Sequence, residues 1–404
     1  MTVEPSMNPR IVRNVLFVLF ALPGIAFASW VSRTPVIRDI LHVSTAEMGI
    51  IIFGLAAGSL LGLLSAGNVI SRIGGRLVIL GSALLIVIGF VIVGLGTAFS
   101  LTSMVFVGLV IFGGGYGTAE VALNVEGSAV ENQLNKTLLP AFHGSFSMGT
   151  LIGAIIGSGA AALRIPVVIH FGAMAAMIAA VTFYLYRYLP HDTGKEKEVS
   201  TQKVGSNMKV QLAVWKERRI LLIGIIVLGM AFAEGAANDW LPLTMVDGYG
   251  VDSLTGSYMY GLFVTAMTIG RFTGGFILDK YGRVPVLKGS AVLAAVGIIL
   301  VIWGQHYLLA GLGILLWGLG ASLGFPVGLS AAGDDPRGAD VRVGAVATIG
   351  YIAFLVGPPG LGLLGEHVGL LHALIVVLIG VIVAGLISGA ARPVGTKEKN
   401  EIKI

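Results

Sequence analysis

The chain has 404 residues, of which 55% are hydrophobic and 12% are charged. Soluble domains carry roughly 25% charged residues, so this composition excludes an ordinary water-soluble fold. It favours a chain that lies in lipid, where a charged side chain at the bilayer centre costs about 2.5–3.5 kcal/mol. Cysteine is absent, which excludes disulfides, thiolate zinc sites and cysteine nucleophiles.

Twelve apolar runs are long enough to cross ~30 Å of hydrocarbon as helices. The predicted spans are 12–31, 46–67, 77–97, 102–125, 139–163, 166–188, 219–242, 255–278, 285–304, 307–331, 342–365 and 369–391. The sequence therefore predicts an all-α membrane protein with twelve transmembrane helices in two pseudo-symmetric six-helix bundles.

The distribution of positive charge predicts the orientation. With the N-terminus inside, 22 of the 26 Lys and Arg residues fall in cytoplasmic segments or at the cytoplasmic ends of spans. Arg33, Arg38 and Arg164 fall outside, and Arg271 lies within a span. The positive-inside rule therefore favours two cytoplasmic termini. Positive charge placed this way indicates membrane topology and not a nucleic-acid partner, although the net charge is +5.

The first span resembles a signal peptide, because Arg10 and Arg13 precede an apolar stretch that ends in Ala26-Phe27-Ala28. A related segment argues against cleavage. GIAFASW at 24–30 has a counterpart, GMAFAEG, at 229–235. The first span therefore behaves as the first helix of an internal repeat.

A constant offset of 208 residues relates the two halves of the chain. It places GNVISRIGG (67–75) on GFILDKYGR (275–283), Gly149 on Gly357, and Glu126 on Asp334. The long polar stretch 189–218 separates six spans from six and reads as a charged linker. We expect an N-terminal half at 1–188, a cytoplasmic linker at 189–218 and a C-terminal half at 219–404. Internal repeats around a midplane site are typical of secondary transporters.

The two repeated loops resemble the major facilitator superfamily signature, G-x-x-x-D-(R/K)-x-G-R. The second copy is intact as Gly275, Asp279, Lys280, Gly282 and Arg283, whereas the first has Ser71 in place of the Asp. The pieces SWVSRTPVIRDIL, GTAEVALNVEG and AFHGSFSMGTLIGA resemble the YbjJ-like inner-membrane proteins, which are similar to fucose-permease-type sugar porters and to rhizopine transporters. This resemblance implies a multi-pass protein of the bacterial cytoplasmic (inner) membrane that works as a monomer without a cofactor.

The signature loops predict an inner gate. Asp279 is expected near the start of span 11, where free helix amides favour an anion. Arg283 can reach Asp334, and by the offset Arg72 or Arg76 should reach Glu126. These pairs would latch the cytoplasmic side in an outward-open state and break when the site opens inward. The full inner-gate set is Arg72, Arg76, Glu126, Asp279, Lys280, Arg283 and Asp334.

Ionisable residues inside spans indicate function, because their burial is costly. Glu120 in span 4 and His143 in span 5 are expected at similar depth, with Asn124 one turn from Glu120 on the same face. They form a candidate proton-coupling pair, and Glu234 is a third candidate. The alternative is a buried polar contact that fixes helix packing.

Span 7 carries Glu234, Asn238, Asp239 and Trp240, and the run Gly-Ala-Ala-Asn after Glu234 favours a broken helix. Aromatic faces with amides and carboxylates suit a sugar-like ligand. The aromatic residues have core packing or interfacial anchoring as the alternative. The candidate substrate-binding residues are Trp30, Asn124, Glu234, Asn238, Trp240, Trp317 and Tyr351.

Three further charged residues carry predictions. Arg271, in span 8, is a snorkelling cation or the partner of a carboxylate, and we favour a structural pair near the inner gate. Arg33 and Asp239 lie at the outer ends of spans 1 and 7 and are predicted to pair across a closed outer gate.

The sequence thus predicts a secondary active transporter, a proton-coupled importer of a small polar solute that is sugar- or cyclitol-like. Its partners are that solute, protons and the lipid bilayer, with no nucleic acid and no metal. A proton-driven efflux antiporter is the first alternative, although span 4 lacks an Arg and span 5 lacks a Gly-Pro motif. A non-transporting membrane sensor is the second. An enzyme is not expected, because no nucleophile, metal-ligand or nucleotide motif is present.

Overall fold

The computed structural model describes residues 8–136, 138–195, 214–334 and 338–393. These residues form helices and no strand. Twelve of the helical segments are long and apolar enough to cross a membrane, which confirms the predicted number of spans. The helices are α1 (Pro9–Val31), α2 (Thr34–Leu41), α3 (Thr45–Ile73), α4 (Gly75–Ala98), α5 (Thr102–Leu134), α6 (Leu139–Ala162), α7 (Val167–Leu185), α9 (Arg218–Tyr249), α10 (Ser253–Tyr281), α11 (Arg283–Trp303), α12 (Tyr307–Ala321), α13 (Gly324–Ala332), α14 (Ala339–Val368) and α15 (Leu370–Ile387).

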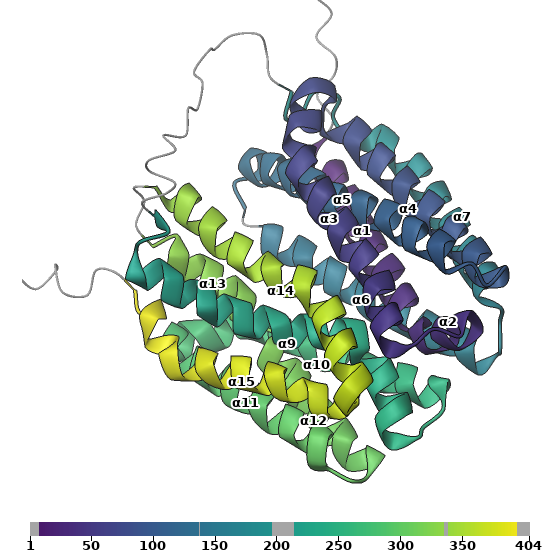
Figure 1. Ribbon diagram of the computed structural model, residues 1–404. Coiled ribbons are helices and arrows are strands. Elements are labelled where there is room, and N and C mark those ends of the chain that lie inside the picture. Colours follow the sequence, from purple (N-terminus) through teal and green to yellow (C-terminus); the bar gives the residue numbers. More distant parts are fainter. Residues whose placement is uncertain (1–7, 137, 196–213, 335–337, 394–404) are drawn as a thin grey trace, which may run out of the picture.

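The helices form two bundles, α1 to α7 and α9 to α15, which lie side by side in Figure 1. The start of α1, the end of α7, the start of α9 and the end of α15 share one end of the molecule, which we call the terminus face. The end at which α3 and α10 begin is the opposite face. This arrangement agrees with the predicted pair of six-helix bundles.

Capping residues and glycines explain where α3 and α10, which occupy equivalent places in the two bundles, begin and end. Ser44 and Glu47 form a reciprocal capping box at the start of α3, and Asp252 caps α10 by accepting a hydrogen bond from the Thr255 amide. At their other ends, α3 and α10 stop at Gly74 and Gly282, whose φ angles of 86° and 76° favour glycine. These two glycines are related by the 208-residue offset.

The repeat extends to helix packing. A Cβ atom at Gly62 would lie 2.3 Å from the Gly114 carbonyl oxygen, and one at Gly270 would lie 2.3 Å from the Ser322 Oγ. The two contacts are related by the sequence repeat, because Gly270 lies 208 residues after Gly62 and Ser322 lies 208 residues after Gly114. In lipid, helices associate through close van der Waals packing, so a glycine is needed at each of these contacts.

The predicted break in span 7 is wrong, because α9 continues without interruption from Arg218 to Tyr249. A break would leave backbone groups without partners, whereas a continuous helix satisfies them internally. Glu234 and Asn238 then lie one turn apart on the same side of an intact helix. The interrupted span is the tenth, where two turn residues, Ser322 and Leu323, separate α12 from α13.

Candidate functional site

A cavity of about 1110 Å³ lies between the two bundles. Helices α1, α3, α5 and α6 line one wall, and α9, α10, α13 and α14 line the other. Its lining includes Asp279 at the end of α10, Arg283 at the start of α11 and Pro393, so it reaches the terminus face. Lipid contact cannot explain the ionisable side chains found on these walls, because an unsolvated charge there is costly.

The wall of the N-terminal bundle carries Glu120, Asn124 and His143. The His143 Nε2 lies 3.1 Å from the Asn124 Oδ1, and the Asn124 amide donates to the Glu120 backbone carbonyl at 2.8 Å. Glu120 and His143 are therefore joined through Asn124 rather than in direct contact. No described residue forms an ion pair with the Glu120 carboxylate, which faces the cavity.

The wall of the C-terminal bundle carries an ion pair. Arg271 donates to a Glu234 carboxylate oxygen at 2.8 Å and to the Ser147 hydroxyl at 3.3 Å. Since Ser147 belongs to α6, Arg271 links the two bundles at this depth. The prediction that Arg271 partners a carboxylate is confirmed, but the partner lies on the cavity wall rather than at a gate. The pair places a carboxylate and a guanidinium side by side on the cavity wall.

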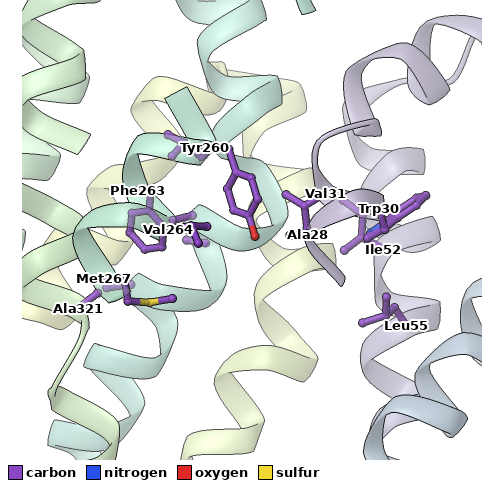
Figure 2. Packing of buried hydrophobic residues seen from close by; sticks show 14 of the residues in the cluster. Ala28, Trp30, Val31, Ile52, Leu55, Tyr260, Phe263, Val264, Met267 and Ala321 are labelled. Carbon is purple, nitrogen blue, oxygen red and sulfur yellow. The ribbon is translucent and has the colours of Figure 1, made fainter. Parts of the chain in front are cut away.

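Tyrosine side chains from both bundles line the cavity and interact with groups on both walls. Tyr116, one turn before Glu120, interacts electrostatically with Glu120, Glu234 and Arg271. Tyr351 of α14 interacts in the same way with Glu120, across the cavity. Tyr260 donates to the Asn238 Oδ1 at 3.3 Å, and its ring points from α10 toward the segment that carries Ala28 and Val31 (Figure 2). The arrangement can bind a solute through hydroxyl, amide and carboxylate groups from both bundles.

The opposite face is closed by contacts that join the bundles. Arg38 of α2 forms an ion pair with Asp247 of α9. Burial lowers the pKa of Arg38, but the hydrogen bond and the charge of Asp247 raise it above its usual value. The Ala46 amide at the start of α3 donates to the Glu366 carboxylate at 3.1 Å. The Ser257 hydroxyl donates to the Ser32 carbonyl oxygen at 2.6 Å. The cavity is thus closed at one end and open at the other.

The predicted outer-gate pair of Arg33 and Asp239 is not formed. Arg33 donates to the Ile165 carbonyl oxygen at 2.6 Å, within its own bundle, while Asp239 lies on the cavity wall. The pair that joins the bundles is Arg38 with Asp247. Sequence position placed Arg33 at the end of a span, but α1 ends at Val31, and a turn then directs the next helix toward the partner bundle.

The three predicted tryptophan contacts are also wrong for the described cavity, because Trp30, Trp240 and Trp317 are buried and absent from its lining. Trp317 donates to the Ala233 carbonyl oxygen at 3.1 Å and packs against Phe263. Figure 2 shows Trp30 within the packed core near Ile52. Indole rings supply large apolar areas for packing, and all three are buried in helix contacts, although the Trp240 Nε1 has no hydrogen-bond partner among the described residues.

The signature loops behave differently in the two bundles. Arg283 pairs with Asp334, as predicted, and Arg219 also contacts Asp334 at 2.8 Å. Arg76 instead contacts the His191 ring, and Glu126 is fully buried without an Arg72 or Arg76 partner. Asp279 lines the cavity, and Lys280 lies over the Tyr281 ring. Because the Arg283 pair is intact while its face is open, the prediction that it breaks in this state is wrong.

Sequence reasoning missed the tyrosines at 116 and 260 and underrated Arg271. Tyr116 lies four residues before Glu120, which places it on the same helix face and was a usable signal. The pairing of Arg271 with Glu234 joins residues 37 positions apart and has no local signature.

A model of the Major Facilitator Superfamily matches residues 15–358. An uncharacterized MFS-type transporter of Yersinia pestis is 26% identical over 365 residues, covering 90% of this chain and 91% of that protein. An uncharacterized transporter of Sinorhizobium fredii is 29% identical over 369 residues, covering 89% of this chain and 95% of that protein. The membrane protein MosC of Rhizobium meliloti is 27% identical over 373 residues, covering 90% and 86%.

Solved structures share the fold. A mutant form of the nucleoside transporter NupG superposes with a TM-score of 0.77 at 14% identity, covering 94% of this chain and all of that one. The fucose:proton symporter FucP of E. coli superposes with a TM-score of 0.62 at 16% identity, covering 93% and 98%. At these identities the likeness concerns the arrangement of helices alone.

Proposed function

The chain belongs to the major facilitator superfamily, and we propose that it imports a small polar solute together with protons by alternating access. The observation that carries this proposal is the cavity between the bundles, whose walls hold Glu120 on one side and the Glu234–Arg271 pair on the other. The distribution of Lys and Arg supports a bacterial inner-membrane protein with both termini on the cytoplasmic side. In that orientation the cavity faces the cytoplasm.

Alternating access requires the two ends of the cavity to open in turn. The contacts at the opposite face join the two bundles and must break before a solute enters from that side. The terminus face then closes as the bundles rock about the site. Arg271 donates one hydrogen bond to each bundle, so a rotation of one bundle against the other would change the distances in these bonds.

Glu120 is the proposed proton carrier. Its carboxylate faces the cavity without an ion-pair partner, so protonation changes its charge without breaking a bridge between side chains. Glu234 differs because it forms an ion pair with Arg271, which protonation of its carboxylate would break. We assign His143 and Asn124 a supporting role, since they orient the helix turn that carries Glu120.

Glu120→Gln in proteoliposomes tests this assignment. The variant should lose proton-driven accumulation of solute, by more than about tenfold, and keep solute exchange in the absence of a pH gradient. Glu234→Gln is the matched comparison, and it should impair both activities because it disrupts the pair with Arg271. Normal accumulation by Glu120→Gln would remove Glu120 from the coupling step.

A sugar- or cyclitol-like solute fits the polar groups best. Asn124, Asn238, Tyr116, Tyr260 and Tyr351 offer amides and hydroxyls beside aromatic faces, a combination that suits a ring with several hydroxyl groups. Two of the structural neighbours are named for nucleoside and fucose transport, which is consistent with this class. Polar metabolites that bind the folded protein should raise its melting temperature, so a thermal screen can identify the solute.

Asn238→Ala tests the site itself. Loss of the amide should weaken solute binding by about tenfold, since a hydrogen bond to a neutral group contributes about 0.5–1.5 kcal/mol. Asn68→Ala, in the last part of α3 and outside the cavity lining, is the control. Unchanged affinity in Asn238→Ala would move the solute away from α9.

A second function, proton-driven efflux, is favoured by one feature. Apolar side chains occupy much of the cavity wall and suit a larger apolar solute; among them are Leu60, Leu63, Leu139, Phe272 and Leu278. The direction of flux under an imposed pH gradient separates the two functions. Import carries solute in the same direction as protons, and efflux carries it in the opposite direction.

A further inference from the structure

A cluster of buried polar atoms lies in the N-terminal bundle, away from the cavity. Arg33 is 2% exposed, and its Nε and Nη1 atoms have no hydrogen-bond partner. The Ser29 hydroxyl and both ring nitrogens of His170 are likewise buried without a partner. Each unsatisfied group costs about 1–3 kcal/mol, and more when it is charged. Three such side chains in one region therefore require a physical explanation.

The three side chains come from segments that meet at the opposite face. Ser29 and Arg33 lie one turn apart where α1 leads into α2, and His170 lies in the first turn of α7. Arg33 donates to Ile165 in the connection that leads into α7 and acts electrostatically on the His170 ring. The cluster is thus held together by α1, α7 and the connection between α6 and α7.

The charge of this cluster is positive and uncompensated. No carboxylate among the described residues forms an ion pair with Arg33, and burial lowers its pKa. The first amides of α7 add the positive end of a helix dipole, because the helix begins at Val167 without a side-chain cap. The guanidinium and the helix amides can only donate hydrogen bonds, and the Ser29 hydroxyl and the His170 ring can each donate one.

We propose that Ser29, Arg33 and His170 bind a small monovalent inorganic anion of halide size, such as chloride. An anion accepts hydrogen bonds from all of these donors and also neutralises the guanidinium. A water molecule would satisfy some donors but would leave the buried charge in place. A halide fits better than an organic anion, because a larger ligand would displace the buried side chains that surround the cluster.

The site is separate from the proposed transport cavity, since none of the three residues lines that cavity. Its anion fixes the corner between α1 and α2, and α2 carries the Arg38 side chain that pairs with Asp247 across the bundles. The bound anion therefore stabilises the closed form of the opposite face. Removing the anion should loosen this corner before it affects solute binding.

Thermal unfolding of the purified full-length protein tests the proposal. Chloride is titrated against gluconate, an organic anion too large for the site, at constant ionic strength. The wild-type melting temperature should rise with chloride and reach a plateau, because at ten times the dissociation constant an anion favours the folded state about 11-fold. Arg33→Gln should abolish the rise. Equal melting of the wild type in both salts would overturn the proposal.

Two further variants keep the test decisive. Ser29→Ala retains the buried charge and should raise the chloride concentration of half-maximal effect about tenfold, even if Arg33→Gln fails to fold. Arg164→Asn is the control, because Arg164 is exposed in the connection that contains Ile165 and asparagine tolerates its positive φ of 52°. It should keep the wild-type response. An unchanged midpoint in Ser29→Ala, or a chloride response retained by Arg33→Gln, would place the anion elsewhere.

Discussion

The two ends of the molecule are held by different kinds of contact. At the opposite face, Arg38 with Asp247 and Ala46 with Glu366 join one bundle to the other. At the terminus face, Arg283 and Arg219 with Asp334 form pairs within one bundle. Only contacts between bundles differ in energy between the two states of a rocking transporter. The comparison therefore separates residues that set the conformation from residues that stabilise a bundle.

Gly49 should give the largest effect. It lies in α3 against α14, and a Cβ atom there would lie 2.8 Å from the Pro358 carbonyl oxygen and 3.1 Å from the Gly362 Cα. Gly49→Ala should therefore prevent the opposite face from closing. Overpacking costs about 1–3 kcal/mol, enough to shift a two-state balance by about 5- to 150-fold. Distances between spin labels across that face should lengthen, and transport should fall by a similar factor.

Gly67→Ala is the matched control in the same helix, because a Cβ atom at Gly67 meets no heavy atom within 4 Å. Its label distances should equal those of the wild type. If Gly49→Ala leaves the opposite face closed, the packing of α3 on α14 does not define the closed state.

The ion pair between Arg38 and Asp247 should have a smaller effect on the same balance. Partly exposed pairs contribute about 0–1 kcal/mol, so Arg38→Gln should favour opening of the opposite face by up to about fivefold. Reversing both charges should partly restore the balance. Asp39→Asn is the control, since Asp39 contacts Arg38 within α2 and lies outside the interface. Additive effects of the two single substitutions at Arg38 and Asp247 would show that the pair is not coupled.

Substitution at the terminus face should change stability without changing conformation. Arg283→Gln removes one of the two cations on Asp334, and we expect the melting temperature to fall by the equivalent of about 1 kcal/mol. Distances between the bundles should stay constant, because both partners move together. A change in those distances would mean that this pair contributes to the inner gate after all.

Asp252 should give the smallest effect, which depends on pH. Hydrogen bonds from the Thr255 side chain and backbone hold the pKa of Asp252 below its usual value. Its contribution is therefore complete above the unfolded-state pKa of about 3.9 and is lost as the pH falls through the lower folded-state pKa. Asp252→Ala should cost about 1 kcal/mol at pH 7, and the difference from wild type should shrink below about pH 4. A difference that is independent of pH would exclude the carboxylate as the cap.

The sequence predicted well what repeats or recurs along the chain. Span positions follow from runs of apolar residues, because lipid excludes unpaired backbone and charge. The 208-residue offset predicted the matching of Gly74 with Gly282. His143 and Tyr351 are separated by the same 208 residues, and both line the cavity.

The predictions that failed concern the direction of side chains and the continuity of a helix. Trp30 and Trp240 lie at the expected places in their helices but face the core, because hydropathy does not tell which side of a span meets the partner bundle. The break expected after Glu234 does not occur, because intact backbone bonding inside a membrane outweighs a local preference of glycine and asparagine.

By itself, the sequence determined the membrane class, the twelve spans, their repeat and the ionisable residues within them. Each of these depends on the solvent around a helix or on comparison of the chain with itself. Only the tertiary structure decided that Arg271 pairs with Glu234, that Arg38 rather than Arg33 joins the bundles, and which end is open. The reason is physical: these contacts join distant segments, and their formation depends on helix rotation and on the angle between the bundles, which no local pattern encodes.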